Sequence, residues 1–84
     1  MSTSAADRAR LRMFVAELLL DRGDRAAFSD SSSLLGSGRL DSLSAIELIT
    51  FLEQEFAVDF DAVDFDFSCV DSVDAMAALL EGPR

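Results

Sequence analysis

The chain has 84 residues, half of them apolar, and a formal net charge of −9, with no histidine and a single cysteine, Cys69. This length is near the lower limit at which one hydrophobic core stabilises a fold. We therefore expect a single domain over residues 1–84, with a core at about 5–81 and disordered residues 1–4. Without histidine there is no imidazole base to activate a nucleophile, and one cysteine allows no internal disulfide. The composition thus disfavours a hydrolase or a metal enzyme and predicts no catalytic residues and no metal site.

The charge is divided unevenly along the chain. Residues 1–40 hold six arginines and five acids, whereas residues 41–84 hold one arginine and eleven acids. Because there is no lysine and no cationic cluster, nucleic acid is disfavoured as a partner. The acidic half predicts either a solvated surface or a face that steers toward basic patches on partner proteins.

The sequence also bears on where in the cell the protein is expected. No apolar stretch approaches the roughly 20 residues that span a bilayer, so membrane insertion is not expected. The N-terminus lacks the basic stretch followed by an apolar one that marks a secretory signal. With a single cysteine, this predicts a reducing compartment, and we expect a cytoplasmic protein.

Residues 5–21 are predicted to form the first helix. Their apolar residues recur with the i, i+3, i+4, i+7 spacing of one helix face, and Gly23 is a suitable C-terminal stop. The residues of this stripe are Leu11, Phe14, Val15, Leu18 and Leu19.

A long connection rich in serine, glycine and aspartate follows over residues 22–40. Loops of this length in a compact domain are usually functional or anchored by their own side chains, and Phe28, Leu34 and Leu35 are the expected anchors. The tripeptide Arg22-Gly23-Asp24 matches an integrin-binding motif, but we interpret it as the punctuation of a helix end.

The second helix is predicted to run from about residue 42 to 56, capped by Asp41 or Ser42. Its buried stripe should comprise Ala45, Leu48, Ile49, Leu52 and Phe56. Leu43 and Ile46 fall outside this stripe, beside acidic residues. They form either an exposed docking pair or a contact beneath the long loop.

Residues 57–70 alternate aspartate and phenylalanine. A period of two is typical of a strand, but one lone strand has no partner, so a short helix or turn is expected. Phe60, Val63 and Phe67 should reach the core. A calcium loop is disfavoured, because the glycine and the bidentate glutamate that such a loop requires are missing.

The last helix is expected after Asp71-Ser72, either of which can cap it, and should end at Gly82-Pro83. Its apolar stripe comprises Val73, Met76, Ala77 and Leu80. Cys69, just before this helix, is expected to be a small buried hydrophobe.

Ser42 stands where the long loop gives way to the second helix. At a helix start, backbone N–H groups and the positive end of the helix dipole favour an attached anionic group. Since no histidine is available to make this hydroxyl a nucleophile of its own, Ser42 is better interpreted as a site that is modified.

The run Gly38…Leu40-Asp41-Ser42-Leu43, followed by a helix with Ile46-Glu47-Leu48 and Glu53…Glu55-Phe56, resembles the acyl carrier protein family. The similarity covers nearly the whole chain. It implies an all-α fold, a small four-helix bundle with a long first loop and a short third helix.

The resemblance also implies a cofactor and a set of partners. In that family the serine of Asp-Ser-Leu, here Ser42, receives 4′-phosphopantetheine from coenzyme A through a separate phosphopantetheinyl transferase. The carrier is not an enzyme; it holds an acyl group as a thioester and presents it to acyl-loading and acyl-processing enzymes with basic docking patches. Carried over position by position, the partner-binding residues are Asp41, Leu43, Ile46, Glu47, Thr50 and Glu53.

The cargo is less sharply indicated. Thr50 and Gln54 differ from the residues common in carriers of primary fatty acid biosynthesis, and the pattern around Leu40 resembles discrete carriers of specialised pathways such as polyketide or antibiotic biosynthesis. D-alanyl, other aminoacyl or peptidyl carriers are the alternative.

A free-standing, monomeric carrier is expected. Outside the family, the chain could be a small acidic interaction module in which Ser42 only caps a helix.

Overall fold

The computed structural model describes residues 5–60 and 66–81. In these ranges the chain forms helices only, and no strand is present. The elements are α1 (Ala5–Asp21), α2 (Ser42–Phe56), the 3₁₀ helix η1 (Phe67–Val70) and α3 (Val73–Glu81). The all-α prediction is therefore confirmed, and the bounds of α1 and α2 agree with those predicted. The described chain has three α-helices rather than four, because the expected short third helix is one 3₁₀ turn.

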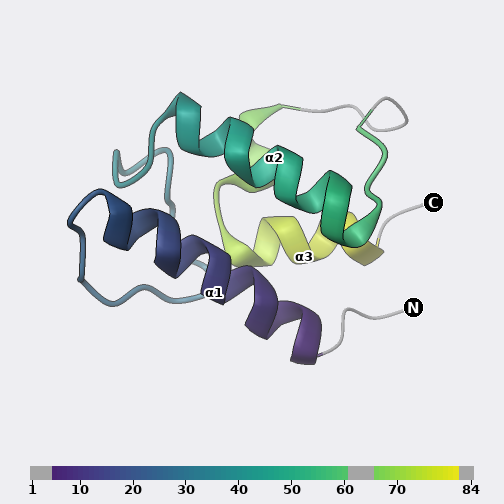
Figure 1. Ribbon diagram of the computed structural model, residues 1–84, viewed down its shortest axis with the longest axis horizontal. Helices are drawn as coiled ribbons and strands as arrows, with labels where there is room; N and C mark the ends of the chain where they lie inside the picture. Colours follow the sequence, from purple (N-terminus) through teal and green to yellow (C-terminus); the bar gives the residue numbers. More distant parts are fainter. Residues whose placement is uncertain (1–4, 61–65, 82–84) are drawn as a thin grey trace.

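The three α-helices pack around a shared core, with α2 and α3 running in the same general direction and α1 running opposite to both (Figure 1). α1 runs opposite to α2, and the chain returns between them through the long loop of residues 22–40. α3 runs opposite to α1 and packs against both α1 and η1, while η1 also contacts α2. The loop and the start of α2 therefore lie at one end of the molecule.

The core is built from the predicted helix stripes. In α1 every stripe residue is buried except Phe14, which is half-buried, and in α3 all four are buried. In α2 three stripe residues are buried, while Ile49 and Phe56 are half-buried and pack against the core. The loop is anchored as expected: Leu34 is fully buried, and Phe28 and Leu35 pack against the core from its edge.

The segment before α3 differs from the prediction at one position. Phe67 was expected in the core, but its side chain is 50% exposed, so this prediction is wrong. η1 has only four residues, and Val70, which is fully buried, fills the core position that the turn offers. Phe60 does pack against the core. Cys69 is a half-buried free thiol rather than a fully buried residue.

Several predictions lie outside the described residues: those for residues 1–4, for Val63 and for the helix end at Gly82-Pro83. Within the ranges that the structure describes, no helix is both long and apolar enough to cross a membrane.

Candidate functional site

Ser42 is the first residue of α2, and its side chain is exposed. The residue before it, Asp41, has an extended backbone and is the N-cap: its Oδ1 accepts a hydrogen bond from the Ser44 amide at 3.0 Å. The Asp41 carbonyl also accepts from the Ala45 amide at 3.0 Å. Since Asp41 performs the capping, the Ser42 hydroxyl is not needed for it and remains accessible. Of the two caps that the sequence allowed, the structure selects Asp41.

Asp41 also pairs with an arginine at the start of the long loop. Arg22, just beyond the end of α1, donates from Nη1 to Asp41 Oδ2 at 2.9 Å. The Ser44 amide, and after it Arg22, lower the pKa of the Asp41 carboxyl below its usual value. Arg22 thus partly neutralises the acid next to Ser42. The sequence alone does not indicate this role, because Arg22 and Asp41 are brought together only through the fold of the long loop.

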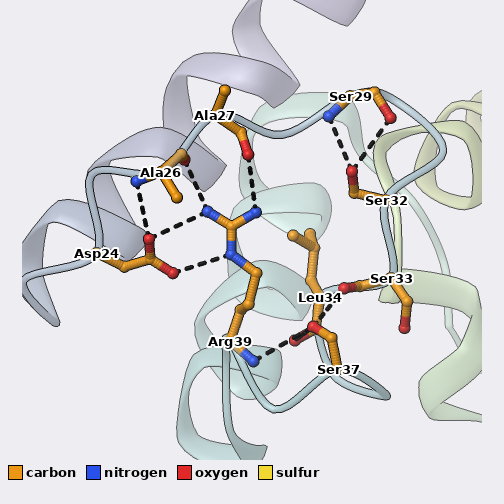
Figure 2. Close-up of polar contacts among 9 residues, drawn as sticks. All are labelled: Asp24, Ala26, Ala27, Ser29, Ser32, Ser33, Leu34, Ser37 and Arg39. Atoms are coloured by element: carbon orange, nitrogen blue, oxygen red, sulfur yellow. Dashed lines mark hydrogen bonds and ion pairs between the residues drawn. The ribbon is translucent and has the colours of Figure 1, made fainter.

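The long loop is folded onto itself by a second arginine, Arg39 (Figure 2). Its guanidinium donates to both carboxylate oxygens of Asp24, at 2.9 and 3.1 Å, and to the carbonyls of Ala26 at 2.7 Å and Ala27 at 3.1 Å. The bidentate contact with Arg39, together with the Ala26 amide, lowers the pKa of Asp24. The start of the loop is therefore joined to its end, three residues before Ser42. Asp24, which sequence analysis interpreted only as helix-end punctuation, has this structural role.

Asp71 fastens the middle of the loop to the turn before α3. Its carboxylate accepts from the amides of Leu35 at 2.7 Å and Gly36 at 3.0 Å and from the Ser33 hydroxyl at 2.8 Å. Its carbonyl accepts from the Leu34 amide at 2.7 Å. Burial raises the pKa of Asp71, but these hydrogen bonds outweigh it, so the pKa is lowered overall. Sequence analysis predicted Asp71 or Ser72 as the α3 cap. The Ser72 hydroxyl accepts from the Ala75 amide, which frees Asp71 to bind the loop.

The start of α2 fits a phosphate ester on Ser42. The first amides of a helix have no partner within the helix, and here the Asp41 side chain uses the amide of Ser44. The amides of Ser42 and Leu43 have no hydrogen-bond acceptor among the described residues. Donors of this kind at a helix N-terminus favour an anion, and the Ser42 hydroxyl supplies the oxygen to which it would be joined.

The structure divides the six predicted partner-binding residues into two groups. The side chain of Asp41 is bonded within the fold, whereas Leu43 and Ile46 are 72% and 55% exposed. The alternative that Leu43 and Ile46 pack beneath the loop is therefore wrong. The other three, Glu47, Thr50 and Glu53, are also exposed.

These exposed acids and Thr50 differ in their bonding. Glu47 and Glu53 form no ion pair within the described part of the chain. The Thr50 hydroxyl donates to the Ile46 carbonyl at 3.0 Å, so its methyl group is the part that remains for an apolar contact. The outer face of α2 consequently presents apolar side chains beside carboxylates that have no cation of their own.

Comparison with models of protein families gives a match over most of the chain. The family model described as the phosphopantetheine attachment site matches residues 9–80. This range includes Asp41, all of α2 with Ser42 as its first residue, and η1. No curated protein and no solved structure matches the chain significantly.

Proposed function

The chain belongs to the family of proteins with a phosphopantetheine attachment site, and we propose that Ser42 is the residue that carries the group. The observation that supports this is the geometry of Ser42: an exposed hydroxyl on the first residue of α2, relieved of capping by Asp41. Proteins of this family bind 4′-phosphopantetheine covalently and work with phosphopantetheinyl transferases and acyl-handling enzymes.

In the proposed modification, the Ser42 oxygen forms a bond to the phosphorus that bears the pantetheine arm of coenzyme A. The bond from this phosphorus to the remaining nucleotide breaks, and the transferase removes the hydroxyl proton. The product is a phosphodiester beside the free amides of Ser42 and Leu43. Arg22 reduces the repulsion between this phosphodiester and Asp41, because it is paired with the Asp41 carboxylate.

Once modified, the protein acts as a carrier and performs no catalysis of its own. The thiol at the end of the arm holds an acyl group as a thioester. Tethering raises the effective concentration of that group at each enzyme that docks the carrier. The exposed face of α2, with Leu43 and Ile46 beside Glu47 and Glu53, is suited to enzymes with basic docking patches.

For the cargo we propose an acyl intermediate of a polyketide or related specialised pathway. The support is the residue pattern around Ser42 and the presence of Thr50 on the outer face of α2, since Thr50 itself offers only its methyl group for an apolar contact. D-alanine or another amino acid is the alternative. Loading by an adenylating ligase that requires ATP and a free amino acid would distinguish the two.

We further propose a monomer in the cytoplasm.

The test is the intact mass of the protein after incubation with coenzyme A, magnesium and a broad-specificity phosphopantetheinyl transferase. The wild type should gain one phosphopantetheine, and Ser42→Ala should gain none. Ser31→Ala is the matched control: it removes an exposed serine hydroxyl of the long loop and should be modified like the wild type. A gain on Ser42→Ala would contradict the assignment of the site. No gain on any variant would favour the alternative, an acidic interaction module.

A further inference from the structure

An apolar groove runs along the seam between α1 and α2. It consists of two adjoining hollows of about 310 and 200 Å³ that share Phe14, Phe51 and Glu55. The first is otherwise lined by residues of α2, which are Ile46, Glu47, Thr50 and Gln54. The second is otherwise lined by residues of α1, which are Arg10, Met13 and Glu17. The groove therefore extends the outer face of α2 onto α1.

Aromatic rings form the floor of the groove. The rings of Phe14 and Phe51 are stacked across the seam, with centroids 4.2 Å apart and planes 10° from parallel. Both side chains are half-buried, so one side of this stack remains open. Met13 and Ile46, 65% and 55% exposed, stand on the two walls. Apolar side chains from both helices are thus left in contact with solvent at one place.

The rim of the groove is acidic. Three carboxylates line it, Glu17, Glu47 and Glu55, against the single cation Arg10. Arg10 is engaged within the fold, because it pairs with Glu55 and lies over the ring of Phe56, 4.7 Å from the centroid. Glu17 and Glu47 form no ion pair with any other described residue. An uncompensated negative rim around an apolar floor favours a cationic, amphipathic occupant.

We propose that this α1–α2 groove binds a partner enzyme through an apolar side chain of that enzyme flanked by arginine or lysine, so that α1 takes part in docking together with α2. This rests on the proposed carrier function, since the partner is an enzyme that handles the cargo. The apolar side chain lies over the Phe14–Phe51 stack, and its basic neighbours face Glu17 and Glu47. The groove shares Ile46, Glu47 and Thr50 with the outer face of α2, so one partner surface covers both.

A second copy of the chain fits the groove poorly. Each copy carries a net charge of −9, and the groove of each has an acidic rim. Bringing two such surfaces together places like charges opposite each other, which is costly in an interface.

The test uses the full chain, labelled with ¹⁵N, and a short synthetic amphipathic helical peptide that carries one phenylalanine flanked by arginines. A second peptide with glutamate in place of each arginine is its control. On titration with the arginine peptide, saturable amide shifts are expected at Met13–Glu17 and over residues 46–55. The glutamate peptide should cause none, and the binding should weaken as salt is raised.

Variants with substitutions in α1 distinguish peptide binding in this groove from peptide binding on the outer face of α2 alone. Met13→Ser combined with Glu17→Arg should weaken binding of the arginine peptide on the order of tenfold. The matched control is Leu20→Ser combined with Asp21→Arg, which makes the same two kinds of change at exposed positions of α1 that line neither hollow. It should change the affinity less than about twofold. Both variants should melt near the wild type, and the control variant, Leu20→Ser combined with Asp21→Arg, should gain phosphopantetheine at the wild-type rate.

The proposal is overturned if no saturable shifts occur, if the shifts are confined to α2, or if the two α1 variants weaken binding equally. Shifts that depend on the concentration of the protein alone would assign the groove to a second copy. Shifts caused by attaching an acylated arm without peptide would assign it to the cargo. The mass gain on Ser42 is independent of all these outcomes, so failure of the groove and failure of the carrier function are distinguishable.

Discussion

The long loop that leads to Ser42 and the outer face of α2 that follows it use their acids in opposite ways. In and around the loop, Asp24, Asp30, Asp41 and Asp71 each accept bonds from arginines, amides or hydroxyls. Three of these acids, Asp24, Asp30 and Asp41, form ion pairs with arginines distant in the sequence. On the outer face of α2, by contrast, Glu47 and Glu53 form no ion pair within the described chain.

The acids of the first region therefore stabilise the fold, whereas the acids of the second region are available to interact with other molecules. The electrostatic potential of an acid that is paired with an arginine is partly cancelled by that cation. An exposed acid without a cationic partner attracts a basic partner protein with its whole charge. The serine lies at the boundary of the two regions. It is therefore held in place by the first region and presented beside the second. The predictions that follow test this division, beginning with the loop.

Leu34→Ala should have the largest effect on stability. The Leu34 side chain is fully buried and anchors the middle of the loop, so its truncation leaves a cavity in the core. Such substitutions cost about 2–5 kcal/mol of the free energy of unfolding, a large share for a domain of this size. Chemical denaturation would measure the change. Leu20→Ala is the control, because Leu20 is 52% exposed and should change the stability by less than about 0.5 kcal/mol. Equal losses in both would show that the loop is not anchored as described.

Asp71→Asn should have the next largest effect, about 1–2 kcal/mol at neutral pH. The substitution keeps the shape of the side chain but removes the charge that strengthens the bonds from the Leu35 and Gly36 amides and the Ser33 hydroxyl. The loop should loosen as well, so the amides of Leu35 and Gly36 should exchange with solvent faster in the variant. Unchanged exchange would contradict the role of Asp71 as the fastening of the loop.

The same pair of proteins gives a prediction on pH. The pKa of Asp71 is lowered in the folded state, so its contribution to stability is fully present above the ordinary aspartate value of about 4. It is lost as the pH falls through the lowered pKa, because the carboxyl becomes protonated in both states. The difference in unfolding free energy between wild type and Asp71→Asn should be constant from neutral pH to about pH 5 and shrink below about pH 4. A difference that grows with acidification would contradict this.

The helices and the core were predictable because they depend on local patterns. The apolar spacing of α1, α2 and α3 identifies their buried faces without knowledge of the fold. The start of α2 also has a local signal, since Asp41 and Ser42 are both good caps and directly precede an amphipathic stretch. The proposal for Ser42 rests on the same short run, and the structure places Ser42 at an exposed position.

The contacts that position the site were not predictable, because they join residues far apart in the sequence. Nothing near Arg22 indicates that it pairs with Asp41, and nothing near Asp71 indicates that it binds amides of the loop. Phe67 illustrates the same limit for apolar residues. A phenylalanine in a short turn has no periodicity to assign it a face, and the neighbouring Val70 occupies the core instead. Long-range geometry decides all three cases.

The smallest effect on stability is expected for Glu47→Gln and Glu53→Gln, alone or together. Since neither acid has an ionic partner in the described chain, their neutralisation should change the unfolding free energy by less than about 0.5 kcal/mol. It should slow association with a basic transferase severalfold at low salt, and this loss should disappear at high salt. Asp41→Asn is the informative comparison, because asparagine caps a helix as well as aspartate does but no longer pairs with Arg22. If Asp41→Asn slowed association as much as the two glutamine variants, the bonded acid would face partners too, and the division between building and docking charges would not hold.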